Sequence, residues 1–188
     1  MSVFVAEELS EVLNTKVVIG RINIGLLNRI IIDDVLLDDQ SGQEMLKVTR
    51  LSAKFDIMPF FKGKISISSV QLFGFNINLR KETPDSPPNF KFVLDAFASK
   101  DTVKKENSLD LRINSILIRR GRMSYHVLSE EETPGKFNAK HIQLQNIIAN
   151  ISLKALSKDS LNLGIKRLSL DEKASGFSLK KMSLKLVA

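Results

Sequence analysis

The sequence predicts a mostly-β protein: a curved, coiled antiparallel sheet built from repeated strand units, with an N-terminal helix and one further short helix covering part of it. Most of the chain alternates apolar and polar residues, as half-buried strands do. One spacing of apolar residues recurs eight times, and only two segments show helical spacing. A length of 188 residues and a hydrophobic content of 43% fit one folded domain, which we expect over residues 1–188.

The helical segments are residues 1–14 and 89–99. In the first, Val5, Leu9 and Leu13 recur at helical spacing, and Ser2 is placed to cap the helix. The second follows two prolines and starts with Asn89, a residue that favours the capping position. A very short helical turn is also expected at residues 58–61.

The recurring spacing places apolar residues at positions i, i+2, i+5 and i+7. The eight copies are Val17, Ile19, Ile22, Ile24; Ile30, Ile32, Val35, Leu37; Leu46, Val48, Leu51, Ala53; Ile65, Ile67, Val70, Leu72; Leu111, Ile113, Ile116, Ile118; Ile142, Leu144, Ile147, Ala149; Leu163, Ile165, Leu168, Leu170; and Phe177, Leu179, Met182, Leu184. Strand side chains alternate with period two, so the spacing changes parity in its middle. Both pairs share one face only if a residue is added between them, as in a β-bulge; otherwise the strand bends there. Either arrangement predicts a strongly curved sheet.

Turn signals separate the copies. Residues 38–42 and the pair Arg120–Gly121 predict hairpins, and residues 26–28 and 175–176 predict turns. Residues 83–88 and 129–135 have the composition of polar, proline-bearing loops. A charged linker at residues 100–108 divides a strand-rich half over 15–82 from a second over 109–188.

Residues suited to catalysis or metal binding are few. The chain has no cysteine, which excludes a thiolate site, and its two histidines, His126 and His141, are expected to lie apart without a ligand partner. The acids at residues 33–44 lack the alternation of a calcium loop. No nucleophile with an oriented base is evident, and Ser124 lies near His126 by chance. The sequence therefore predicts a protein that is not an enzyme, with no cofactor and no metal.

The net charge of +7 favours an anionic partner, either nucleic acid or membrane headgroups. The basic residues are scattered between apolar ones, which is typical of solvated strand faces, and with no tryptophan and one tyrosine the chain lacks the aromatic residues of a single-strand nucleic-acid binder. No stretch approaches the roughly 20 apolar residues that span a bilayer. Both ends of the chain look cut, and we expect it to be a fragment of a larger protein with an anchoring segment upstream of Met1.

An apolar sheet face needs a covering layer, and two short helices are too small to cover a sheet of eight units. Two alternatives remain: the core is fully self-covered, or part of this face is a groove for an apolar ligand. Within residues 64–79, Val70 and Leu72 are at even-numbered positions and the other apolar residues are at odd-numbered ones, so a regular strand would place the two sets on opposite faces. The candidate residues for lining the apolar face are Ile65, Ile67, Phe73, Phe75, Ile77, Ile113, Leu144 and Ile165.

The chain also resembles a known family. Residues 9–22 are similar to the segment that follows the N-terminal membrane anchor in AsmA-like proteins, and residues 29–42 to their strand, turn and strand. Residues 55–67, followed by 70–74, resemble the family's short turn, glycine and strand pair, and residues 111–125 its next unit. The most similar type is the translocation and assembly module subunit, TamB, in its N-terminal periplasmic part.

The resemblance implies a location in the periplasm of a diderm bacterium, anchored to the inner membrane upstream. It implies a β-sheet groove that contributes to lipid transport between the membranes and to outer-membrane biogenesis. The implied partners are phospholipid acyl chains and, through the rest of the chain, an outer-membrane barrel protein, with no nucleic acid, small-molecule substrate or catalytic residue. The alternative is a structural scaffold that binds a partner protein by strand addition at a sheet edge, and a weaker third is a basic nucleic-acid binder.

Overall fold

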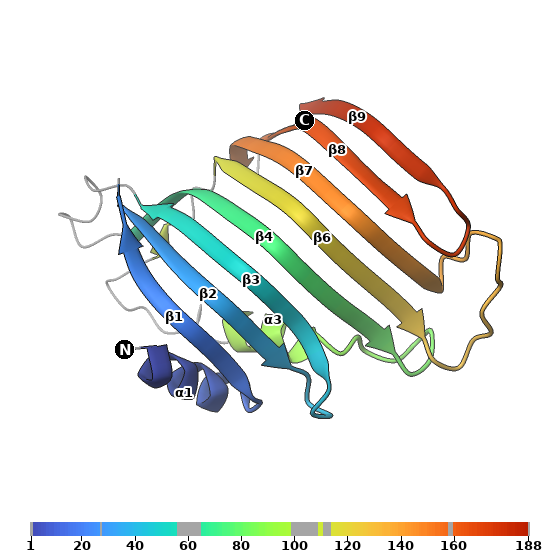
Figure 1. Ribbon diagram of the computed structural model, residues 1–188, viewed down its shortest axis with the longest axis horizontal. Coiled ribbons are helices and arrows are strands. Elements are labelled where there is room, and N and C mark those ends of the chain that lie inside the picture. The colour runs from blue at the N-terminus through green and yellow to red at the C-terminus, as the bar shows by residue number, and fades with distance from the viewer. Residues whose placement is uncertain are drawn as a thin grey trace.

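The computed structural model describes residues 2–26, 28–55, 65–98, 109–110, 114–157 and 160–187 of the chain. The elements are α1 (Ser2–Leu13), β1 (Val17–Gly25), β2 (Arg29–Asp38), β3 (Glu44–Phe55), β4 (Ile65–Lys81), α3 (Lys91–Ala98), β5 (Leu109–Asp110), β6 (Ser115–Val127), β7 (His141–Ser157), β8 (Ser160–Glu172) and β9 (Ser178–Val187). The long strands form one open sheet in the order β1-β2-β3-β4-β6-β7-β8-β9, with the two-residue β5 paired to β4 (Figure 1). The predicted mostly-β fold with two helices is confirmed.

One strand pair departs from the expected antiparallel arrangement. β4 and β6 pair in parallel at the centre of the sheet, whereas the other long neighbours are antiparallel. A parallel pair needs a crossover connection of a dozen or more residues. The chain between β4 and β6, residues 82–114, has that length and contains α3. The two strand-rich halves are therefore hydrogen-bonded to each other within one sheet.

The two helices lie toward the same end of the sheet. α1 ends at Leu13, and Asn14 adopts a left-handed conformation (φ 48°), a common way to end a helix. α3 begins at Lys91 rather than Asn89, because the Asn89 side chain is used elsewhere. Its amide donates to the Asp39 carboxylate at 3.1 Å, and its oxygen accepts from the Arg80 backbone at 3.1 Å. Asn89 thus links the crossover to β4 and to the β2–β3 turn.

The strand registers align the apolar residues of neighbouring copies into rows. Ile19 lies opposite Val35, Val35 opposite Val48, and Val48 opposite Phe75. A second row lies on the other side of the two-residue spacers. It consists of Ile22, Ile32, Leu51, Leu72 and Ile118. The first row runs from β1 to β4 and the second from β1 to β6, so apolar residues collect on one face.

Bulge-like distortions keep both halves of each copy on that face. In β2, β4, β6 and β7 the second residue of the spacer has a left-handed φ: Asp34, Gly74, Arg120 and Asn146, at 57°, 64°, 55° and 53°. The sequence left two arrangements open, a β-bulge or a bend. These four strands have the β-bulge, in which one residue is added between the two apolar pairs. In β4 and β6 the copy on the buried face is shifted five residues along from the predicted one: Val70, Leu72, Phe75, Ile77 in β4 and Ile116, Ile118, Gly121, Met123 in β6.

Most turn predictions agree with the structure, and one is wrong. Residues 39–43 connect β2 to β3 with Gly42 at φ 77°, and residues 173–177 connect β8 to β9. Residues 82–90 and 128–140 are the expected loops, although the second is longer than predicted. Arg120 and Gly121 do not form a hairpin but lie inside β6, because the left-handed Arg120 makes a bulge rather than a chain reversal. The short helical turn at 58–61 and the linker at 100–108 lie outside the described residues.

Two clusters of buried apolar side chains form on the rows. The first, Leu13, Leu37 and Met45, is packed against Phe90, Phe92 and Val93 of the α3 segment, so the helices cover this end of the face. The second, Val48, Phe75 and Ile147, joins β3, β4 and β7 at the centre of the sheet. Among the described residues, no helix is both long and apolar enough to cross a membrane.

Candidate functional site

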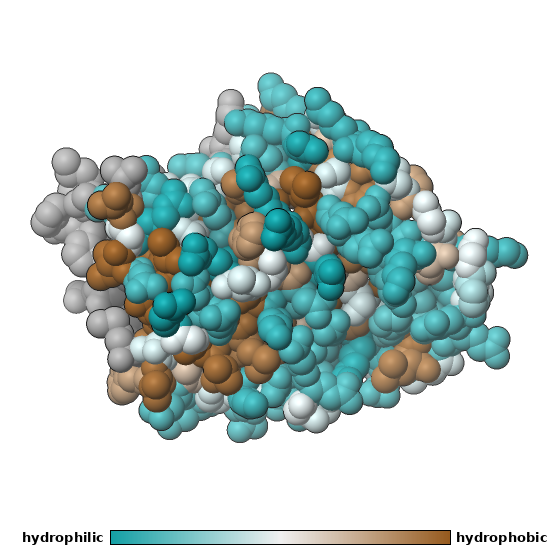
Figure 2. Space-filling view, in the orientation of Figure 1, coloured by the Kyte–Doolittle hydropathy of each residue, from teal (hydrophilic) through white to brown (hydrophobic). Residues whose placement is uncertain are grey.

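The two faces of the sheet differ in chemistry. The face that carries the apolar rows holds both buried clusters and is the one on which α3 packs. The opposite face is turned toward the viewer in Figures 1 and 2, and hydrophilic residues dominate it, with hydrophobic ones gathered mainly near β1–β3. The apolar face is thus the candidate site, and the polar face is its solvated back.

The apolar face is closed at its centre and opens toward β9. Phe75 fills the space over Gly121, where a Cβ would meet the Phe75 ring at 2.4 Å, and the ring contacts Ile147. Two apolar residues of β9 are accessible: Leu184, opposite Ile165, is 44% exposed and Leu186, opposite Leu163, is 40% exposed. Exposed apolar residues of this face therefore lie along β9, and at the opposite edge Ile24 in β1 is also exposed.

Three of the candidate residues are brought together by the structure. Phe75 is a member of the central cluster, and Ile77 and Leu144 pack against it from β4 and β7. Ile67 and Ile165 are half-buried in β4 and β8 and belong to neither described cluster. Two further candidates are Ile65, whose side chain lies outside the described residues, and Ile113, which lies outside them entirely.

The prediction that Phe73 and Phe75 share a face is wrong. The left-handed Gly74 between them reverses the parity, so Phe75 is buried at 7% exposure while Phe73 lies on the polar face at 39%. There the Phe73 ring is covered by the Arg120 guanidinium at 5.2 Å, a cation–π contact. Phe73 is therefore removed from the candidate apolar site.

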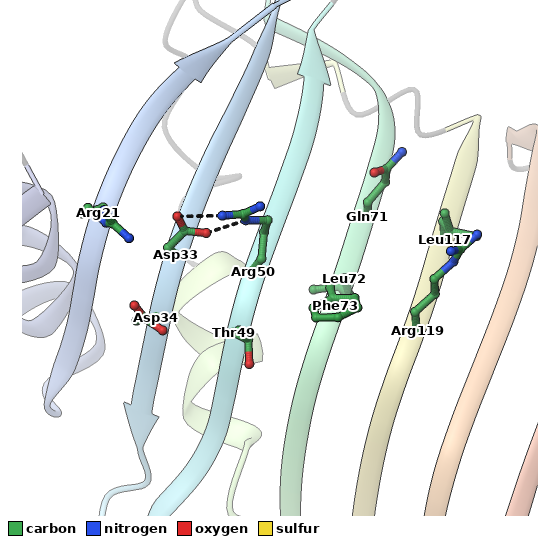
Figure 3. Close-up of a pocket in the computed structure, with 10 residues that line it drawn as sticks. All are labelled: Arg21, Asp33, Asp34, Thr49, Arg50, Gln71, Leu72, Phe73, Leu117 and Arg119. Atoms are coloured by element: carbon green, nitrogen blue, oxygen red, sulfur yellow. Dashed lines mark hydrogen bonds and ion pairs between the residues drawn. The ribbon is translucent and has the colours of Figure 1, made fainter.

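A hollow of about 760 Å³ lies on the polar face over β1–β6 (Figure 3). Its walls are the side chains of Arg21, Asp33, Asp34, Thr49, Arg50, Gln71, Leu72, Phe73, Leu117 and Arg119. Arg50 donates two hydrogen bonds to Asp33, at 2.6 and 3.1 Å, which lower the pKa of the Asp33 carboxyl below its usual range despite its burial. This pair neutralises part of the charge, and the hollow is open and of mixed polarity rather than an apolar pocket.

Two buried carboxylates stabilise hairpin turns instead of forming a reactive pair. Burial by itself raises the pKa of Asp39, but hydrogen bonds from Ser41, Asn89 and Gln43 outweigh burial and lower the pKa. Glu172, at the start of the β8–β9 turn, behaves in the same way: bonds from Ser175, Ala174 and Gln143 lower its pKa to about 2. Both acids are ionised at neutral pH and serve the fold.

The expectation that His126 and His141 lie apart is wrong. They are register partners at the ends of β6 and β7, with their Nδ1 atoms 3.0 Å apart. The sequence separation of 15 residues conceals this contact, because the loop at 128–140 brings the chain back on itself. Ser124 donates its hydroxyl to Asn78 on β4, so it is not the partner of His126.

Sequence reasoning missed the exposed leucines of β9, Leu184 and Leu186, as candidate site residues. Their signal was present, because Leu184 closes the last copy of the spacing. The spacing alone does not show which copy forms an edge strand of the sheet.

Comparison with known proteins does not assign a family. No protein-family model matches the chain, and no curated protein matches it in sequence.

Proposed function

We propose that this chain is a non-catalytic, membrane-proximal part of a cell-envelope protein that holds phospholipid acyl chains on the apolar face of its curved sheet. The observation that carries the proposal is the uninterrupted row of apolar register partners that runs from Ile22 in β1 through Ile118 in β6 to Met182 in β9. Such a face must be covered, and a long hydrocarbon is the chemical class that matches a continuous apolar track.

The dimensions suit one acyl chain at the open side. Half of a bilayer core of about 30 Å is about 15 Å, roughly the length of one acyl chain. Neighbouring strands are about 4.8 Å apart, so a chain laid across the strands covers about three spacings, the width from β6 to β9. The proposed path follows one row of register partners across these strands: Ile118, Ala149, Leu168 and Met182.

The proposal places the whole protein in the periplasm of a diderm bacterium, where a polar medium separates two membranes. Lipid would then move along the apolar face while its headgroups stay in solvent at the rim of that face. An inner-membrane anchor and an outer-membrane barrel partner, supplied by the rest of the protein, complete this proposal.

Photocrosslinking tests the face directly. A benzophenone amino acid placed at Leu184 lies on the apolar face, and the same amino acid at the adjacent Lys185 points to the other face and is the matched control. In cells making the protein, we expect phospholipid adducts, detected by mass spectrometry, to be several-fold more abundant at 184 than at 185. Lipid extraction from the unmodified protein should give phospholipid near one molecule per chain. Equal crosslinking at both positions, or lipid-free protein, contradicts the proposal.

A second candidate function, a scaffold that binds a partner by strand addition, is favoured by a separate observation. β9 is the last strand of the described sheet, and Val187 on it is 65% exposed. An added strand would protect the outward-facing backbone amides of β9 from hydrogen exchange, whereas an acyl chain on the apolar face would leave them exchanging. Hydrogen exchange on protein isolated with whatever it carries therefore separates the two.

A further inference from the structure

The two histidines of the chain form a close pair at the β6–β7 end of the sheet. His126 and His141 are directly opposite in the register, their Nδ1 atoms are 3.0 Å apart, and their rings are tilted at 55° with centroids 5.3 Å apart. With 2 histidines and no cysteine in the sequence, all of the chain's imidazole ligands are at this one place. This pairing is independent of the apolar face discussed above.

The buried histidine has a fixed tautomer. His141 is 7% exposed, and its Nε2 lies 2.9 Å from the backbone oxygen of Glu130. A carbonyl oxygen only accepts, so Nε2 carries the proton and donates it to Glu130. The Nδ1 of neutral His141 is then left with its lone pair directed toward His126. A histidine that donates its other ring N–H to a carbonyl is the usual arrangement at a metal centre.

A carboxylate completes a set of three ligand atoms. The Glu132 Oε1 atom lies 3.8 Å from the His126 Nδ1 and 4.0 Å from the His141 Nδ1, and the three atoms fall within 4.8 Å of one another. Glu132 sits in the loop between β6 and β7. That loop is tied down by Asn138, whose amide donates to the Glu131 backbone oxygen at 3.2 Å, and by the Asn138–His141 bridge.

We propose that His126, His141 and Glu132 form a binding site for a divalent transition cation of the Zn²⁺ class. Zn²⁺ takes imidazole nitrogen and carboxylate oxygen at about 2.0–2.2 Å, so two of its tetrahedral ligands lie about 3.3 Å apart. The observed separations, from 3.0 to 4.0 Å, bracket that value, and adjustment of the 63%-exposed Glu132 closes the difference. Two nitrogens and one oxygen favour Zn²⁺ over Ca²⁺ or Mg²⁺, which prefer oxygen alone.

The surroundings leave room for the fourth ligand and for entry. A hollow of about 190 Å³, lined by Glu132, Asn138 and His141 among others, adjoins the three ligand atoms. Of the neighbouring cations, Lys140 is paired with Glu130 at 2.7 Å, which offsets its charge, and Lys173 is among the residues that line the hollow. We therefore assign the fourth position to solvent water.

The competing interpretation is a plain hydrogen bond between the two imidazoles. Two Nδ1 atoms at 3.0 Å attract one another only when one is protonated, so His126 would donate to His141. A bound cation replaces that single proton and uses both lone pairs. The two interpretations therefore differ in one measurable respect, whether the chain takes up a cation at this place.

Isothermal titration of the untagged chain with Zn²⁺, in a buffer that does not chelate metals, tests the proposal. We expect one site per chain, and a Glu132→Gln or His126→Gln variant should weaken binding at least about tenfold, because outer-shell losses already cost 10–100-fold. Glu131→Gln is the matched control, an equally exposed acid one residue away, and should bind as the wild type does. His141 is left unchanged because it is buried and supports the loop.

Two results would overturn the site. One is the absence of saturable Zn²⁺ uptake by the wild type up to the millimolar range. The other is binding that Glu132→Gln and His126→Gln leave unchanged, which would place the cation elsewhere. X-ray absorption of the loaded wild type gives a second readout, with two imidazole nitrogens expected around zinc. Circular dichroism of both variants verifies that they are folded, so that weakened binding is not a consequence of unfolding.

Discussion

The β1–β4 half and the β6–β9 half of the sheet use the same apolar spacing in different ways. In β1–β4 the two-residue spacers lie opposite one another, so each strand adds its residue at the same level and the internal registers are uninterrupted. In β6–β9 the spacers are staggered, and each pair contains register shifts in its interior: between Ile118 and Gly121, for instance, or between Ile165 and Leu168.

This difference has a physical consequence. When both strands bulge at one level, the ladder resumes in step beyond it, whereas a bulge on one strand only disrupts the ladder and increases local twist. The helices pack against one end of the first half, around Leu37 and Met45, while the second half carries the exposed Leu184 and Leu186. β1–β4 therefore forms the more regular part of the sheet, and we expect the interrupted ladders of β6–β9 to twist more strongly.

The largest expected effect is at the point where the halves meet. Phe75→Ala would remove a buried ring that joins β4 to Ile147 of β7, and we expect the free energy of unfolding to fall by about 3–5 kcal/mol. Phe73→Ala, two residues away on the polar face, should cost less than about 1.5 kcal/mol, since the ring is partly exposed and loses mainly a cation–π contact. Urea unfolding measures both, and equal losses would mean that the two rings share a face after all.

Next in size is the acid sensitivity of the β8–β9 turn. The Glu172 pKa is lowered to about 2 from its usual 4.5, so its stabilising bonds are fully present above pH 4.5 and are lost as the pH falls toward 2. A pKa difference of this size corresponds to a contribution on the order of 3 kcal/mol. Glu172→Gln should therefore be clearly less stable than wild type at pH 7, with the gap narrowing below pH 4.5. A gap that does not change with pH would show that the carboxylate charge is irrelevant there.

Gly121→Ala tests the same junction from the β6 side. The added Cβ would lie 2.4 Å from two Phe75 ring atoms and 3.0 Å from the Ile147 Cβ, so the ring must move, and we expect a loss of about 1–3 kcal/mol. Gly25→Ala in β1 is the control: its Cβ would meet the mobile Cδ1 of Ile31 at 3.1 Å, and a loss below about 0.5 kcal/mol is expected. Thermal denaturation of the two variants ranks them, and a reversed order would refute the packing described at Gly121.

The smallest effect concerns the spacer itself, and its sign is what matters. Asp34→Gly would relieve a left-handed φ of 57° and should stabilise the protein by about 0.5–1 kcal/mol. Asp38→Gly, the same substitution in the same strand without a positive φ, should destabilise by a similar amount. Both are read from urea midpoints; if both variants are less stable than wild type, the left-handed spacer at Asp34 is not strained.

Most of the fold could be predicted because period-two alternation and turn residues are local signals. The number of copies equals the number of long strands in the described sheet, and parity alone limited the centre of each copy to a bulge or a bend. The level of the bulge in β4 and β6 was not predictable, since the alternating runs on either side of Gly74 and Arg120 offer two equally regular quartets. Packing of Phe75 over Gly121 chooses between them, and that contact joins residues distant in sequence.

The sites were less predictable than the fold, for the same reason. The pairing of His126 with His141 depends on the register of β6 against β7, and the polar-face position of Phe73 depends on one backbone angle. Neither is visible in a linear pattern. Asp39 was expected only as one of the acids around a turn, and Glu172 was not singled out, because the hydrogen bonds that bury both carboxylates exist only in the folded turns.

The apolar spacing has one more property: its intervals of two, three and two residues are the same in either chain direction. A strand running up and a strand running down therefore present identical rungs to a neighbour, which is why the parallel β4–β6 pair continues rows that the antiparallel pairs begin. Chain polarity is thus decoupled from the apolar pattern. An edge built on this palindrome accepts an extending strand of either polarity, so the sheet can be lengthened, or joined by another segment, without a change in its lining.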